Sequence, residues 1–116
     1  MRSDRPYLLH TLDSIEAIEG FVAGGRESFL GSRLIRDAVI RNFEIIGEAV
    51  GSLSPETRRK HPEVPWRKIV EFRNRLIHGY WSVDALIVWD VIVNDLPRLK
   101  IAVAEDVGES EHGDRG

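Results

Sequence analysis

Apolar residues recur at steps of three and four along most of the chain, which is the spacing of amphipathic α-helices. This pattern predicts a first helix over residues 4–23, with a pair of glycines at its end. A second helix is predicted to begin at Ser28 or Ser32 and to run to Val50. No alternation of apolar and polar residues lasts for more than a few positions, so we expect no β-sheet.

Shorter segments follow in the second half of the chain. Ser54 and Pro55 form a typical N-cap and first-turn pair for a helix that reaches about Lys60. The next helix is predicted over residues 65–79, and Gly79 suits the left-handed conformation that follows many helix ends.

A last long helix is predicted from the N-cap Ser82 onward. Pro97 is expected to kink it rather than end it, because residues 99–103 resume the apolar pattern. The fold class is therefore all-α, an antiparallel bundle of about four to five helices. We also expect a dimer that pairs through the second and last long helices, and the apolar residues that motivate it are Ile35, Val39, Phe43, Ile46, Val91 and Ile92.

Length and composition favour one soluble domain. The 116 residues are 42% hydrophobic and 30% charged, and the lack of cysteine excludes disulfides and thiolate metal sites. The longest apolar run covers only residues 85–89 and the N-terminus has no signal-peptide core, so we expect a cytoplasmic protein without a membrane span. Residues 1–105 are expected to form the helical domain, and residues 106–116 an acidic, disordered tail.

The charges are segregated along the chain. The formal net charge is −3, but residues 58–78 carry seven basic and two acidic side chains, which creates a local field that attracts phosphate. The candidate nucleic-acid contacts are Arg58, Arg59, Lys60, Arg67, Lys68 and Arg75. A solvated polar face is the alternative explanation of such a charge run.

The same segment contains Arg73, Asn74, His78 and Tyr80. Guanidinium binds phosphate in a planar fork and imidazole exchanges protons near neutral pH, so the set suits chemistry at a phosphodiester. On a straight helix, five steps of about 100° separate Arg73 and His78 by about 140°. Either the helix unwinds at His78, or a dimer brings His78 of one chain to Arg73 of the other.

Structural explanations exist for other residues of interest. A histidine or arginine at a helix end often only satisfies carbonyls, and a tyrosine is often a half-buried core residue. We expect His10, His61 and His112 at the surface, and Gly47 and Gly51 at a close helix approach. The three tryptophans are expected in the core or at a dimer contact rather than as base-stacking platforms, and they are Trp66, Trp81 and Trp89.

The spacing Arg73-x4-His78-x-Tyr80 matches the signature R-x4-H-x-Y, and in this the chain resembles HepT-like toxins of the HEPN ribonuclease superfamily. The resemblance extends over residues 34–97 and includes the second-helix segment 42–49.

This resemblance implies a dimeric or larger all-helical ribonuclease that cleaves RNA without a metal or other cofactor. Arg73 and His78 would be catalytic, and Asn74 would orient them. It also implies a partner, a nucleotidyltransferase antitoxin that transfers AMP to Tyr80 and so blocks the site by occupancy and charge repulsion. The alternative function is a non-catalytic subunit of a nucleotidyltransferase that binds nucleotide or the partner's surface and does not need His78.

Overall fold

The protein is all-helical in a computed structural model that describes the backbone of residues 3–115 and the side chains of residues 3–108. These residues form α1 (Arg5–Phe21), α2 (Arg26–Gly31), α3 (Arg33–Gly51), α4 (Pro55–Lys60), α5 (Trp66–Gly79), the 3₁₀ turn η1 (Tyr80–Ser82), α6 (Ala85–Asn94) and α7 (Leu96–Arg115). The described part has no strand, which confirms the predicted class. None of its helices is long and apolar enough to cross a membrane.

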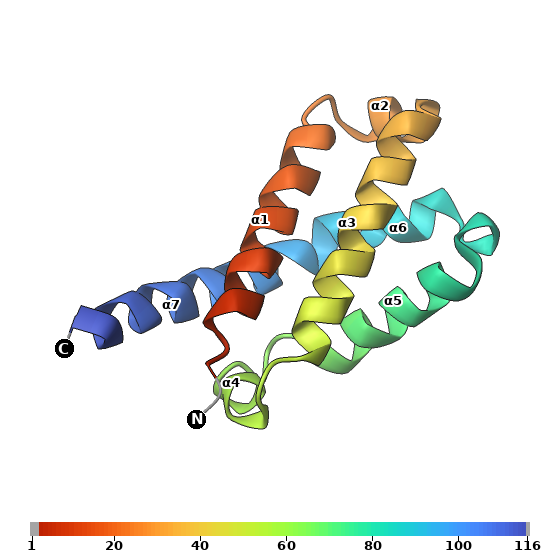
Figure 1. Cartoon of the computed structure of the whole chain (residues 1–116). Helices are drawn as coiled ribbons and strands as arrows, with labels where there is room; N and C mark the ends of the chain where they lie inside the picture. Colours follow the sequence, from red (N-terminus) through yellow and green to blue (C-terminus); the bar gives the residue numbers. More distant parts are fainter. Residues whose placement is uncertain (1–2, 116) are drawn as a thin grey trace.

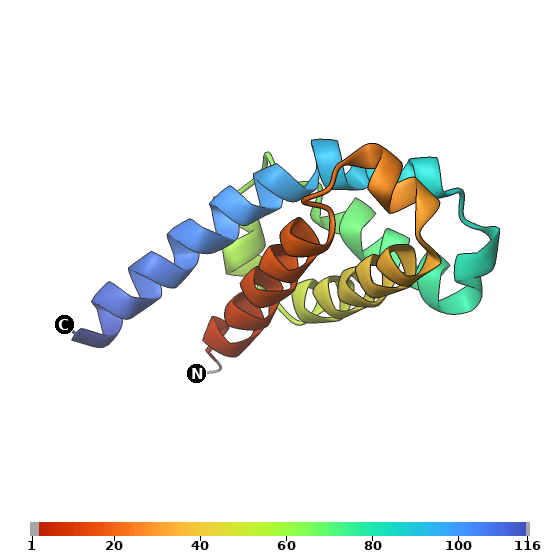
Figure 2. The same ribbon diagram turned by 90° about the horizontal axis from the view of Figure 1, so that it is seen from above.

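Helices α1 and α3 run side by side in opposite directions and make the most extensive helix contact of the described part (Figure 1). Helix α5 packs against α3 and helix α7 packs against α1, so both later helices extend the same core (Figure 2). The largest fully buried side chains in this core are Ile15, Ile18, Phe29, Ile46, Leu76 and Leu99. One face of α5 stays open to solvent, with Asn74, Arg75 and His78 exposed.

Several predicted helix ends are confirmed. Ser32 is extended and its hydroxyl accepts a hydrogen bond from the Ile35 N–H, so the second long helix begins after Ser32, and Ser28 belongs to α2. Ser54 caps α4 in the same way. Gly25, with φ of 91°, provides the left-handed residue between α1 and α2.

Next to the motif, α5 ends at Gly79 as predicted, but the predicted conformation of Gly79 and the predicted cap Ser82 are wrong. Gly79 is the last residue of α5, but its φ of 177° is extended rather than left-handed, and η1 follows it. Ser82 does not cap α6, because its hydroxyl donates a hydrogen bond back to the carbonyl of Gly79 at the end of α5. Asp84 takes over as the N-cap and accepts from the Leu86 N–H.

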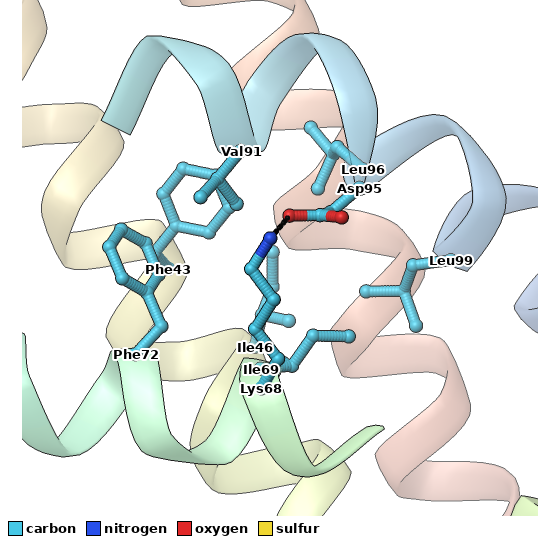
Figure 3. A pocket seen from close by; sticks show the side chains of 9 residues that line it. All are labelled: Phe43, Ile46, Lys68, Ile69, Phe72, Val91, Asp95, Leu96 and Leu99. Atoms are coloured by element: carbon cyan, nitrogen blue, oxygen red, sulfur yellow. Dashed lines mark hydrogen bonds and ion pairs between the residues drawn. The ribbon is translucent and has the colours of Figure 1, made fainter. Parts of the chain in front are cut away.

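The predicted last long helix is two helices rather than one kinked helix. Asp95 separates α6 from α7, and Pro97 lies in the first turn of α7. Backbone N–H groups in a first turn have no acceptor within the helix, so the missing N–H of proline costs no hydrogen bond there. The buried Asp95 carboxylate accepts from Lys68 Nζ at 2.7 Å, beside a small apolar pocket between α3, α5, α6 and α7 (Figure 3). The break between α6 and α7 therefore places the carboxylate of Asp95 where it binds Lys68 of α5.

Residue 106 does not mark the end of the packed structure. Helix α7 continues to Arg115, and the side chains of Asp106 and Val107 are buried. The expected disorder is therefore wrong for residues 106–108, while the side chains of residues 109–116 lie outside the described part. A division of the chain at residue 105 stays a prediction.

The apolar residues that motivated a dimer interface are used within one chain. Val39, Phe43 and Ile46 of α3 are buried in the core, as are Val91 and Ile92 of α6. Helix α2, which the sequence did not indicate as a separate element, packs on both α3 and α6 and covers part of their apolar surface. Dimerisation itself stays a prediction, but these five buried side chains are not available to a second chain.

Candidate active site

The motif lies in the second half of α5, whose opposite face is fixed in the core. Phe72 and Leu76 are buried, and Phe72 meets Phe43 of α3 edge to face with ring centroids 5.4 Å apart. These anchors set the rotation of α5. As a result Asn74 and His78, one turn apart, are both exposed.

Arg73 lies on the flank of α5 that faces α3. A Cβ at Gly47 would lie 2.1 Å from the Cβ of Arg73, so no larger residue fits at position 47 without a shift of the helices. The predicted close helix approach is therefore confirmed for Gly47. It is wrong for Gly51, where a Cβ would meet open space.

Asn74 connects the arginine to the exposed face of the helix. Arg73 Nη1 donates a hydrogen bond to Asn74 Oδ1 at 3.0 Å. The Nε of Arg73 is buried and has no hydrogen-bond partner among the described residues, which costs on the order of 1–3 kcal/mol. The position of the guanidinium thus lowers the stability of the fold. An unpaired buried polar group of this kind calls for an explanation, and a functional role is one.

His78 lies within the regular part of α5. The helix continues to Gly79, so the unwinding that would swing the imidazole toward Arg73 does not occur. Around the helix axis Asn74 lies between the two residues, since it follows Arg73 by about 100° and precedes His78 by about 40°. Within one chain, Asn74 is therefore the link between cation and base.

On a continuous helix, Tyr80 would share a face with Arg73. In the structure it does not. The chain leaves the α-helix at Gly79, and Tyr80 begins η1. Its ring meets that of Trp81 edge to face with centroids 5.6 Å apart, and it lines a groove of about 270 Å³ against α3 and α6. With 39% of its surface exposed, Tyr80 is not a core residue.

Three of the predicted basic residues take part in holding the fold. Arg58 donates to a carbonyl in the last turn of α3. Lys60 pairs with Asp106 at 3.0 Å, and Lys68 pairs with Asp95 at 2.7 Å. The segment 58–78 is therefore less available to phosphate than its formal charge indicates.

The other three, Arg59, Arg67 and Arg75, are exposed. Arg67 lies within about 20° of both Asn74 and His78 around α5, because seven and eleven steps of 100° return close to the start. Its pairing with a carboxylate one turn onward, at 3.3 Å, is solvated and contributes little. The basic surface beside the motif on α5 therefore contains fewer residues than the sequence indicates, namely Arg67 and Arg75.

Sequence reasoning missed the groove beside Tyr80. Trp81 is 77% exposed and is not a core residue, whereas the other two tryptophans are buried or half-buried. Arg33 and Arg36 of α3 line the same groove. No sequence pattern connects the start of α3 with η1, because their proximity arises from tertiary packing.

His61, expected at the surface, is buried beside Asp106 and Glu63. Burial lowers the pKa of His61, but the hydrogen bond and charge of Asp106, followed by those of Glu63, raise it above its ordinary value overall. Among the described residues, no three His, Cys, Asp or Glu side chains gather where they could hold a metal ion. This cluster therefore consists of ion pairs.

Comparison with known proteins identifies the family. A family model described as "Ribonuclease HepT-like" matches residues 11–105. The chain belongs to this HepT-like family. Two relatives are 41% identical: a "Putative RNase" of Caldanaerobacter subterraneus subsp. tengcongensis, over 90% of this chain and 95% of the relative, and a "Probable ribonuclease HepT" of Thermococcus cleftensis, over 85% and 91%.

A third relative of this HepT-like chain is matched over less than half of its own length. It is the "Gamma-glutamylcyclotransferase and putative RNase" of Methanocaldococcus jannaschii, which is 44% identical over 102 residues. The match covers 86% of this chain and 46% of the relative, so the chain spans about half of that protein. No solved structure matches.

Proposed function

We propose that this HepT-like chain is a metal-independent RNA endonuclease that acts as the toxin of a toxin–antitoxin pair. The observation that carries the proposal is the hydrogen bond from Arg73 to Asn74, one turn before the exposed His78. Membership of a ribonuclease family, with relatives named as ribonucleases, supports RNA as the substrate.

In the proposed reaction, neutral His78 accepts the proton of a 2′-hydroxyl, whose oxygen attacks the adjacent phosphorus. The bond from phosphorus to the 5′ oxygen breaks, and that oxygen takes up a proton from solvent. Arg73 binds the phosphate oxygens on which negative charge grows, and Asn74 holds its guanidinium in place.

Two chains complete the site in this proposal. Because Arg73 and His78 are about 140° apart on α5, a symmetric dimer would bring His78 of one chain toward Arg73 of the other. Helix α6 offers a surface for pairing, since Leu86 and Val93 are 47% and 51% exposed. Residues seven apart lie on the same helix face, so α6 presents an apolar stripe.

The proposed partner is a nucleotidyltransferase antitoxin that modifies Tyr80. The phenol oxygen would bond to the α-phosphorus of a nucleoside triphosphate, pyrophosphate would leave, and the phenol proton would pass to a base or to solvent. The exposure of Tyr80 supports this access. An AMP two residues beyond His78 would exclude RNA by its bulk and its negative charge.

Incubation of the purified protein with RNA in the presence of a chelator tests the activity. Arg73→Ala and His78→Ala are each expected to lower the cleavage rate by on the order of 10²–10⁴. Arg98→Ala and His10→Ala change exposed residues on other helices and should leave the rate unchanged. Cleavage by both motif variants at the wild-type rate would instead favour a non-catalytic nucleotidyltransferase subunit.

A further inference from the structure

The groove beside Tyr80 combines apolar and charged surface. It measures about 270 Å³ and is lined by η1, the first turns of α3 and the start of α6. Its apolar part is formed by the half-buried Ile40, Val83 and Ala85 over the buried Phe29 and Val88. Arg33 and Arg36 contribute positive charge. In Figure 1 the chain passes from the C-terminal end of α5 through η1 into α6.

Trp81 gives this groove an aromatic side. Its indole is 77% exposed, so it contributes little to the core. The ring of Tyr80 meets it at 76°, edge to face, which restricts its orientation. An exposed aromatic face is a surface on which proteins stack a base of single-stranded nucleic acid.

The cations of the groove are available to a phosphate. Arg33 pairs with Asp37 at 3.5 Å, but its side chain is 81% exposed, and such a solvated pair is weak. Arg36 donates one N–H to the Leu30 carbonyl, and a guanidinium has five donors in all. Together with Asp37 the groove has a net charge of +1, which suits one phosphate, and the carboxylate can accept a hydrogen bond from a base or ribose.

We propose that this groove binds one nucleotide of single-stranded RNA beside the cleaved bond, with the base on Trp81 and the phosphate on Arg33 and Arg36. This inference rests on the proposed ribonuclease function and extends its substrate contacts beyond α5. Tyr80 lies between the exposed face of α5 and the groove, since it is two residues from His78 and lines the groove. A strand that crosses from one surface to the other therefore covers Tyr80.

Binding of a fluorescent 2′-fluoro RNA of about ten nucleotides, which lacks the attacking hydroxyl, tests the groove. Trp81→Ala is expected to bind on the order of 10-fold to 100-fold more weakly, and Trp81→Phe to recover most of the affinity because it keeps an aromatic face. Arg33→Ala should reduce the salt dependence by roughly one phosphate contact. Ile101→Ala, which shortens an exposed apolar side chain on α7, is the matched control and should bind like wild type.

Cleavage kinetics with ordinary RNA give a second measurement, in which Trp81→Ala should raise KM more than it lowers kcat. Equal affinity of wild type and Trp81→Ala would overturn the groove assignment and leave the ribonuclease function standing. Loss of a dimer by Trp81→Ala in light scattering would also overturn it, because Trp81 would then be a contact between chains. A wild-type protein that neither binds nor cleaves RNA would overturn both proposals.

Discussion

The phenol oxygen of Tyr80 is the atom on which the proposed regulation depends. Tyr80→Phe removes the acceptor of AMP but keeps the ring that lines the groove, so this variant should retain most of its cleavage activity and escape inhibition. Intact-mass spectrometry of each variant co-expressed with the nucleotidyltransferase checks this, with an AMP adduct expected on wild type alone. An adduct of equal yield on Tyr80→Phe would place the modification elsewhere.

Single residues also show the limit of sequence reasoning. The spacing of Arg73 and His78 predicted their place at the end of a helix without any tertiary information. The roles of Lys60 and Lys68 could not be predicted, because their partners Asp106 and Asp95 lie on a different helix or a helix boundary far along the chain. Local patterns identify functional residue types, whereas ion pairs between distant segments decide which charges remain available.

At the scale of elements, the spacing between α3 and α5 decides where Arg73 lies. A methyl group at position 47 would collide with the Cβ of Arg73, so Gly47→Ala must separate the helices or displace the arginine. Such overpacking typically costs about 1–3 kcal/mol. We expect Gly47→Ala to lose that much stability in urea unfolding and to lose RNA cleavage with it.

Gly51→Ala, at the end of the same helix, is the control for this effect. A Cβ there meets open space and Gly51 has no left-handed backbone, so alanine should stabilise by about 0.4–1 kcal/mol. Equal unfolding midpoints for the two variants would show that the helix spacing does not constrain position 47.

Helix boundaries were predictable where a local cap decides them and not where packing decides them. Ser54 caps α4 through its own hydroxyl, as the sequence predicts, and Ser32, one of the two predicted starts of the second helix, caps α3 in the same way. Ser82 is an equally good cap by composition, yet its hydroxyl donates to the carbonyl of Gly79, the last residue of α5. Asp95 interrupts the predicted last long helix, and its carboxylate accepts from Lys68 of α5. The sequence around Asp95 does not indicate this contact, because the two residues are far apart along the chain.

At the scale of the whole molecule, helix periodicity was enough for the all-α class but not for the extent of the fold. The acidic composition after residue 105 favoured a disordered tail, yet Asp106 and Val107 are buried. Buried carboxylates are uncommon without partners, and the partners of Asp106 are the last residue of α4, Lys60, and the next residue, His61. A composition-based boundary cannot anticipate a charge that is neutralised by a distant segment.

Helix α7 is held to the segment after α4 by a buried charge cluster. His61 is 7% exposed, and its Nε2 lies 3.1 Å from Asp106 while Lys60 Nζ lies 3.0 Å from the same carboxylate. Its Nδ1 lies 3.3 Å from Glu63 and 3.9 Å from Glu105. Both ring nitrogens thus face carboxylates, which favours the charged imidazolium and raises the pKa of His61 despite its burial.

This charge cluster is predicted to weaken as the pH rises. Because the pKa of His61 is higher in the folded chain than its ordinary value of 6.5, its contribution is complete below about pH 6.5 and is lost as the pH passes through the folded pKa. At about pH 6, His61→Gln should cost on the order of 1.5–3 kcal/mol in urea unfolding, and the cost should shrink at about pH 8.5. His10→Gln, which changes an exposed histidine on α1, should keep the wild-type pH dependence. If wild type and His61→Gln lose stability equally over this range, His61 is neutral in the folded protein and α7 is held by the lysine and apolar contacts alone.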